Sequence, residues 1–267
     1  MKSIFQFFLV AVSLLGRENV VAAEVKEVGG MFQPTAKIVE QFRGRCTESP
    51  ADYISCLTLA GFLVKQGGET FNVDYYRQAS NEVDRVLSIK PDLESALVQR
   101  AMVHNTMHRF SEAKKIVQEI AKDKSDRIDL LAVLFDSEVE LGDYESASRA
   151  IEKLAALNKT DPAIWARKAR NSELRGELDA ALDQLHKGEQ IIRRESDYSP
   201  ELIWFLLRQG EINFSRGKFE SAEKFYDNAR LIAPNDLRVR EHFAELYGAQ
   251  KKWVEAEKSR SEEHTSE

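Results

Sequence analysis

The chain is poor in residues that break helices. Its 267 residues include 13 glycines and 6 prolines. Glycine and proline are the least favourable residues in a helix interior, so their low content over this length favours a helical protein. Hydrophobic residues make up 43% of the chain and charged residues 31%, which is too apolar for an intrinsically disordered chain.

An excess of positive charge is also missing. The formal net charge is -6, whereas nucleic-acid-binding proteins usually carry a basic stripe or have a high isoelectric point. We therefore predict no nucleic-acid partner. The mild acidity by itself indicates solubility and nothing more specific.

Sequence motifs of catalysis are absent. The chain has no phosphate-binding P-loop pattern, no glycine pattern of dinucleotide binding and no nucleophile elbow. His104 and His108 are four residues apart on an expected helix and would share a face. No third metal ligand accompanies them, so an ordinary structural role is favoured. We predict that the protein is not an enzyme and has no catalytic residues, no metal site and no cofactor.

No hydrophobic run approaches the roughly 20 residues that span a bilayer. A shorter apolar run covers residues 4–15, directly after Lys2, and fits the core of a secretory signal peptide. Small residues at Val21 and Ala23 place cleavage after Ala23. Residues 1–23 are thus predicted to be a signal peptide, and the mature protein to be periplasmic or secreted without stable membrane insertion. The alternative is a membrane anchor formed by uncleaved residues 4–15.

The two cysteines, Cys46 and Cys56, both lie in the expected mature part. Export makes a disulfide chemically permitted. Such a bridge would close a short loop, which corresponds to about 2–3 kcal/mol of stability. The alternative is two free buried thiols.

Three columns of residues recur in phase along the chain. Alanines recur with successive gaps of 34, 34, 34, 41 and 34 residues, at Ala79, Ala113, Ala147, Ala181, Ala222 and Ala256. Large residues three positions earlier repeat the same gaps, at Tyr76, Phe110, Tyr144, Leu178, Phe219 and Trp253. Small or apolar residues form the third column, at Ala101, Phe135, Ala169, Gly210 and Ala244. Such self-similarity indicates a repeat architecture.

The repeated segments resemble the tetratricopeptide repeat family, whose units are 34 residues long. The clearest copy runs from Gly210 to Pro234 and reads GEINFSRGKFESAEKFYDNARLIAP. Two more copies, GDYESASRAIEKL and GELDAALDQLHKG, begin at Gly142 and Gly176. His108 and Lys251 depart from the family pattern because they replace the turn glycine. The resemblance implies an all-α, right-handed superhelical solenoid of antiparallel helix-turn-helix repeats with a concave groove.

The columns have a physical interpretation. Small residues let the paired helices approach closely, and the column of large residues is expected to fill the wedge between units. The single gap of 41 marks an insertion of seven residues, placed near Arg193–Pro200, which should lengthen a second helix and its loop. The expected units are 50–93, 94–127, 128–161, 162–202, 203–236 and a truncated 237–259. Residues 24–49 are expected to be a linker with a short helix near Thr35–Phe42.

The last eight residues, RSEEHTSE at 260–267, resemble a translated sequencing adapter. The adapter sequence AGA TCG GAA GAG CAC ACG TCT GAA encodes all eight. We interpret this tail as artificial and expect the natural protein to continue past about residue 259. The final repeat would then lack its polar capping helix, which solenoids normally need.

The resemblance also implies where a ligand would bind. Groove positions carried over from the family include Arg167, Arg170, Trp204, Leu207, Arg208, Glu211, Phe214 and Arg238. Arginines bind carboxylates with two parallel hydrogen bonds, and the aromatic residues could anchor an apolar side chain. The alternative is that these arginines pair within the protein, with Asp136, Glu173 and Glu211.

The favoured function is an exported scaffold that binds a protein or peptide in its groove. One alternative is the repeat segment of a longer enzyme, such as a transferase, whose catalytic domain lies beyond the truncation. Another is a membrane-tethered assembly factor. The repeat fold hosts many unrelated tasks, so this assignment rests on family analogy.

Overall fold

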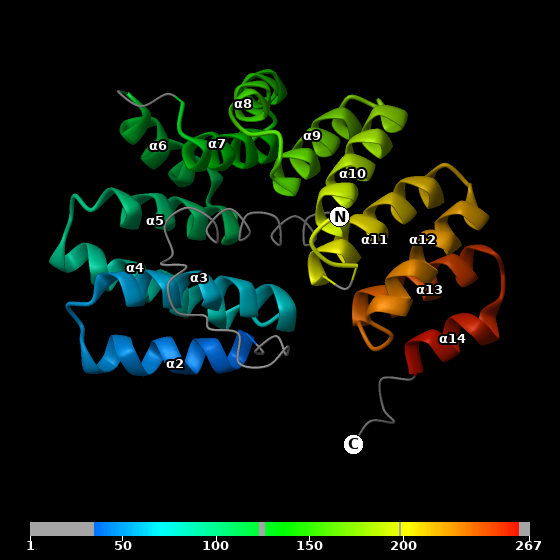
Figure 1. Ribbon diagram of the computed structural model, residues 1–267, viewed down its shortest axis with the longest axis horizontal. Coiled ribbons are helices and arrows are strands. Elements are labelled where there is room, and N and C mark those ends of the chain that lie inside the picture. The colour runs from blue at the N-terminus through cyan, green and yellow to red at the C-terminus, as the bar shows by residue number, and fades with distance from the viewer. Residues whose placement is uncertain (1–34, 123–125, 198, 262–267) are drawn as a thin grey trace. The chain divides into compact units, whose positions relative to one another are not determined.

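The computed structural model describes residues 35–122, 126–197 and 199–261 (Figure 1). The predicted signal peptide and residues 262–267 of the predicted artificial tail lie outside this range. The described residues form thirteen α-helices and no strand, so the predicted all-α fold is confirmed. None of these helices is both long enough and apolar enough to cross a membrane.

The helices fall into two compact units, of which the first ends at Asn158 and the second begins at Lys159. The helices of the first unit are α2 (Thr35–Glu48), α3 (Tyr53–Thr70), α4 (Asp74–Ile89), α5 (Glu94–Thr106), α6 (Phe110–Ala121), α7 (Ile128–Glu140) and α8 (Tyr144–Leu157). Those of the second unit are α9 (Pro162–Leu174), α10 (Leu178–Arg193), α11 (Pro200–Ser215), α12 (Phe219–Ile232), α13 (Leu237–Ala249) and α14 (Trp253–Ser261).

Within each unit, the helices pack as successive hairpins. The hairpins of the first unit are α3 with α4, α5 with α6 and α7 with α8, and those of the second are α9 with α10, α11 with α12 and α13 with α14. The first helices of neighbouring hairpins also touch, because α5 contacts both α3 and α7, and α11 contacts α13. This stacking is that of a helical solenoid, as the repeat predicts.

The repeated alanines are buried between helices, which confirms their predicted role. Five of them have no exposed surface: Ala79, Ala113, Ala147, Ala181 and Ala222. The sixth, Ala256, is half-buried. On the first helices, Ala101, Phe135 and Ala169 are also buried. The in-phase small residues therefore mark the surfaces along which the hairpins close.

Three glycines allow even closer contacts with aromatic rings. A Cβ atom at Gly210 would lie 2.1 Å from Cε1 of Tyr226, which is far inside contact distance. At Gly67 and Gly188 the corresponding distances, to Tyr76 and Phe205, are 2.4 and 2.3 Å. The aromatic rings thus occupy space that any other residue at these glycines would fill.

The column of large residues behaves differently from the prediction. Tyr76 is buried, but Tyr144 is 48% exposed and Trp253 is 67% exposed, while Phe110 and Phe219 are half-buried. From Phe110 onward, each column member is the first residue of its second helix. That position lies beside the turn at the end of the hairpin, so the expectation that this column fills the wedge between units is wrong.

Five turns within hairpins have a left-handed residue two positions before the second helix begins. Gly142, Gly176 and Gly217 have φ angles of 79°, 77° and 71°. His108 and Lys251 take the same left-handed conformation, with φ of 59° and 61°. A residue with a Cβ atom is strained there by about 1–2 kcal/mol. The fold therefore keeps the turn even where the sequence departs from glycine.

Five of the seven inserted residues lengthen two helices, and the other two lengthen the loop between them. Helix α10 has 16 residues, compared with 14 in α8 and α12. Helix α11 also has 16, compared with 13 in α9 and α13. The sequence interpretation placed the extra length in α10 and its loop, and the structure adds that the next first helix takes a share.

Helix α2 is longer than expected from the sequence. It reaches Glu48 rather than ending near Phe42, and it packs against α3. Val39 and Cys46 are buried in this contact, and the Phe42 ring stacks on Phe62 with centroids 5.9 Å apart. The segment from Thr35 onward is therefore an integral helix of the first unit.

Replacing the strained turn residues with glycine should stabilise the protein. We expect His108→Gly and Lys251→Gly each to raise the free energy of unfolding by about 0.5–1 kcal/mol, because glycine adopts positive φ without a Cβ clash. Urea unfolding followed by circular dichroism measures the change. Gly142→Ala is the matched control and should destabilise by a similar amount. Unchanged or reduced stability in both glycine variants would contradict this account of the turns.

Candidate functional site

The eight groove residues named from the sequence lie in the second unit, on three first helices. Helix α9 carries Arg167 and Arg170, helix α11 carries Trp204, Leu207, Arg208, Glu211 and Phe214, and helix α13 carries Arg238. The contact of α11 with α13 places the residues of these two helices side by side.

Arg208 is the centre of this site. Its Nη2 atom lies 2.5 Å from both carboxylate oxygens of Glu173 on α9, and its Nη1 atom pairs with Oε2 of Glu211. The side chain is 9% exposed. Burial opposes the charged guanidinium, but the carboxylates of Glu211 and Glu173 outweigh it and raise the pKa of Arg208. The cation is therefore neutralised by two carboxylates of its own chain.

The second carboxylate, Glu211, also reaches the next first helix. Its Oε1 atom lies 2.6 Å from Nε2 of His242 on α13. Burial raises the pKa of Glu211, but the hydrogen bond from His242 and the charge of Arg208 outweigh it, so the pKa is lowered overall. We call Glu173, Arg208, Glu211 and His242 the charge network, because they join α9, α11 and α13 through alternating charges.

The other predicted arginines also have partners within the chain. Nη1 of Arg167, which is 4% exposed, donates to the carbonyl oxygen of Ala163 at 3.4 Å. Arg170 lies 4.0 Å from Glu173, and Arg238 pairs with Asp236 at 2.6 Å. The positive charges of Arg170, Arg208 and Arg238 are thus compensated by carboxylates of the chain itself.

This arrangement matches the alternative interpretation for Glu173 and Glu211, which both pair with Arg208. In this structure, a carboxylate from a ligand would have to displace Glu173 or Glu211 from Arg208.

The apolar groove positions differ in how accessible they are. Trp204 and Leu207 are 7% and 4% exposed, and the Trp204 ring packs edge to face on Phe205 with centroids 5.0 Å apart. Phe214 is half-buried and contacts the ring of Phe219. Of the two predicted aromatic anchors, Phe214 is therefore the more accessible.

In the first unit, a buried contact between neighbouring first helices is made by neutral groups. Oγ of Ser137 on α7 donates to Oδ1 of Asn105 on α5 at 2.8 Å. Nδ2 of Asn105 donates to the carbonyl oxygen of Val133 at 3.2 Å. Both side chains are buried. A partly exposed ion pair also links Glu94 of α5 to Arg127, the residue directly before α7. The first unit thus buries a neutral contact between first helices, whereas the second unit buries charged residues.

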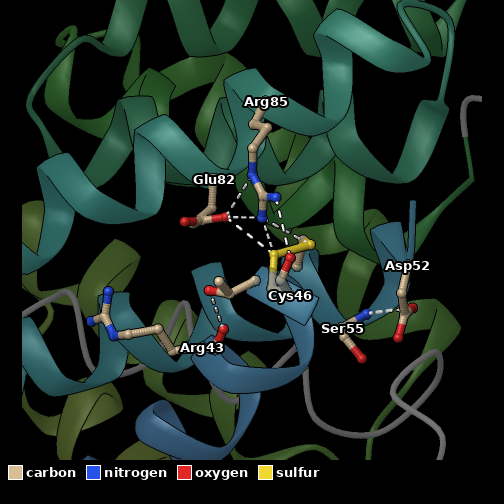
Figure 2. The surroundings of a disulfide bond; sticks show 8 residues. Arg43, Cys46, Asp52, Ser55, Glu82 and Arg85 are labelled. Carbon is tan, nitrogen blue, oxygen red and sulfur yellow. Dashed lines mark hydrogen bonds and ion pairs between the residues drawn. A yellow bond between two sulfur atoms is a disulfide. The ribbon is translucent and has the colours of Figure 1, made fainter. Parts of the chain in front are cut away.

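The two cysteines form a disulfide that joins the end of α2 to α3, with an S–S distance of 2.04 Å. Figure 2 shows Arg85 of α4 reaching this bond, where its Nη2 atom lies 3.0 Å from Sγ of Cys56 and 2.5 Å from Oε2 of Glu82. Its Nη1 atom donates to the carbonyl oxygen of Cys46 at 3.3 Å. Three helices therefore meet at the bond.

The surroundings of the disulfide give little support for a metal site. The sulfur atoms of Cys46 and Cys56 and a carboxylate oxygen of Glu82 lie within 4.8 Å of one another, but the sulfur atoms are bonded to each other. A disulfide has no thiolate with which to bind a metal. The cysteines are best understood as a link between helices.

The histidine pair at 104 and 108 does not share a helix face, contrary to the sequence interpretation. Helix α5 ends at Thr106, and His108 lies in the left-handed turn that follows. His104 is half-buried, and burial lowers the pKa of its imidazole. The left-handed turn breaks the helical spacing on which the expectation depended.

The sequence interpretation did not single out His242, which lies within the charge network. The sequence signal that could have identified His242 is its separation from the acidic residue Glu211. Glu211 and His242 are 31 residues apart, Asn105 and Ser137 are 32 apart, and Glu173 and Arg208 are 35 apart. Residues about one repeat apart meet across neighbouring first helices, so complementary polar residues at this spacing are candidates for contact.

The fold is that of tetratricopeptide-type helical repeats. Two solved structures share this fold. The chain aligns with the Cut9–Hcn1 hetero-tetramer of the APC/C at a TM-score of 0.66, 13% identity, 84% of this chain and 42% of that chain. It aligns with TTC0263, a thermophilic TPR protein of Thermus thermophilus, at a TM-score of 0.59, 18% identity, 70% of this chain and 98% of that chain.

Sequence comparison gives more distant similarity. No family model matches the chain. The human protein O-mannosyl-transferase TMTC1 is 22% identical over 200 residues, which cover 73% of this chain and 22% of that protein. The chain spans less than a quarter of the length of the curated relatives it matches.

Loss of the disulfide should lower the stability of the protein measurably. The bond closes a loop with a sequence separation of 10 residues, for which loop-closure entropy gives about 2–3 kcal/mol. We expect the urea midpoint of the oxidised protein to fall when a dithiol reductant is added. A Cys46→Ser, Cys56→Ser variant should unfold at that lower midpoint with or without the reductant. Equal midpoints for oxidised and reduced protein would refute the stabilising role.

Proposed function

We propose that the chain is an exported, non-catalytic scaffold that binds a protein or peptide along its first helices. The observation that carries this proposal is the side-by-side stacking of first helices, in which α5 contacts both α3 and α7, and α11 contacts α13. Stacked helices of this kind form extended binding surfaces in repeat proteins. The Cut9–Hcn1 structure is itself a complex between different proteins, which supports a protein partner.

The exposure of individual residues indicates which part of the second unit a partner could contact. Glu241 and Glu245 of α13 are exposed, and Phe214 and Arg238 are half-buried. Trp204, Leu207, Arg167 and Arg208 are buried. We therefore propose that the partner contacts Phe214, Arg238 and Glu241. The charge network would hold the first helices together.

Site-specific photo-crosslinking tests the proposed binding face by capturing whichever protein contacts it. A photo-reactive amino acid would replace Phe214 or Glu241 on the first helices, and Glu220 or Glu257 on the second helices as controls of similar or greater exposure. In the source organism, we expect a discrete crosslinked species from positions 214 and 241 and none from the controls. Crosslinking confined to positions 220 and 257 would place binding on the opposite helices.

The proposed export depends on the residues before Thr35, which lie outside the described structure. A disulfide in the first unit supports an oxidising compartment. We expect the N-terminus of the protein recovered from the secretory route to begin at Glu24. Intact-mass measurement of that product checks the cleavage. A product that retains Met1 and sediments with membranes would favour the tethered alternative instead.

A second candidate function is the repeat segment of a longer enzyme. Its support is the similarity to human TMTC1, a protein O-mannosyl-transferase, over 73% of this chain. The similarity is at 22% identity and covers 22% of that protein. The complete gene distinguishes the two candidates, because a neighbouring domain with catalytic motifs would favour the enzyme.

A further inference from the structure

The imidazole of His242 is held between two oxygen acceptors. Its Nε2 atom lies 2.6 Å from Oε1 of Glu211, and its Nδ1 atom lies 2.6 Å from the carbonyl oxygen of Arg238. A neutral imidazole carries one N–H group, whereas an imidazolium carries two. The protonated ring satisfies both acceptors, and a neutral ring can satisfy one of them.

The surroundings of the ring favour its positive charge. Glu211 of α11 faces it directly, with Arg208 on the other side of that carboxylate. Glu245 on the same helix adds a second negative charge. Tyr226 of α12 presents its ring at 69° to the imidazole, with centroids 5.1 Å apart, and burial raises the pKa of that phenol, so it stays neutral beside the histidine.

His242 is 4% exposed, so water cannot readily replace a lost hydrogen bond. Burial lowers the pKa of the imidazole, but the hydrogen bond and charge of Glu211 outweigh burial and raise it overall. Deprotonation would leave either Glu211 or the Arg238 carbonyl facing an unprotonated nitrogen. The contact between α11 and α13 would then lose part of its polar attachment.

We propose that protonated His242 holds α13, and the α14 helix paired with it, against α11. We call this contact the latch. The latch is closed while the imidazole is protonated and loosens when the proton leaves. It would make the order of the last hairpin, and of the surface that α13 presents, depend on pH. The proposal concerns the protein alone and holds or fails independently of any binding partner.

The pH window follows from the directions of the two pKa shifts. The pKa of His242 is raised on folding, so its stabilisation is fully present below the pKa of unfolded histidine and is lost as pH rises through the folded value. The pKa of Glu211 is lowered, so its stabilisation is present above the pKa of unfolded glutamate and is lost as pH falls through the folded value. The latch is therefore closed between these limits.

A histidine titration by NMR tests the proposal on the full chain. We expect the ring signals of His242, assigned through the backbone, to titrate above the value of about 6.5 for free histidine. Glu211→Gln removes the facing charge and should move the titration to lower pH. A His242 titration at or below the free value would overturn the latch, whether or not any variant folds.

Hydrogen exchange tests the consequence for the last hairpin. After correction for the intrinsic pH dependence of exchange, amides of α13 and α14 should lose protection as His242 deprotonates, while those of α9 and α10 should not. In His242→Gln this dependence should disappear. His186→Gln is the matched control, because His186 is exposed on α10, and it should retain the behaviour of the natural protein. Protection of α13 that stays constant through the titration would contradict the proposal.

Discussion

The structure depends on close approach between helices at positions with little or no side chain. Alanines with no exposed surface line the second helices, and Gly210 leaves room for a Tyr226 ring that a Cβ atom would overlap. Protein interiors are packed too densely to absorb extra atoms at such contacts without displacement. If the hairpins could not close at these points, the first helices would not lie side by side, and no shared surface would form.

That packing also explains the polar contacts between first helices. Once neighbouring first helices touch, residues about one repeat apart in sequence face each other. In the first unit these are a buried asparagine and serine. In the second unit they are the charged residues joined through Arg208. Because a buried charge left without a partner is costly, the carboxylates around Arg208 stabilise the helices and reduce the positive charge available to a ligand.

Much of the fold could be predicted from the sequence because the repeat places small residues in fixed columns, and close packing requires them. The same repeat spacing places His108 and Lys251 at the turn position that glycine occupies in other units. The exposure of Trp253 was not predictable from the column, since it depends on where the second helix begins. His242 was missed because its role comes from Glu211, which lies 31 residues away and meets it only when helices stack.

One comparison of glycine substitutions tests the packing constraint most directly. In a helix interior, alanine is normally favoured over glycine by about 1 kcal/mol. At Gly44, where a Cβ atom would meet nothing within 4 Å, we expect Gly44→Ala to stabilise the protein in urea unfolding. At Gly210 we expect the opposite sign, a loss of about 1–3 kcal/mol from overlap with Tyr226. If Gly210→Ala stabilised the protein as Gly44→Ala does, close helix packing at this position could not be what holds the repeats together.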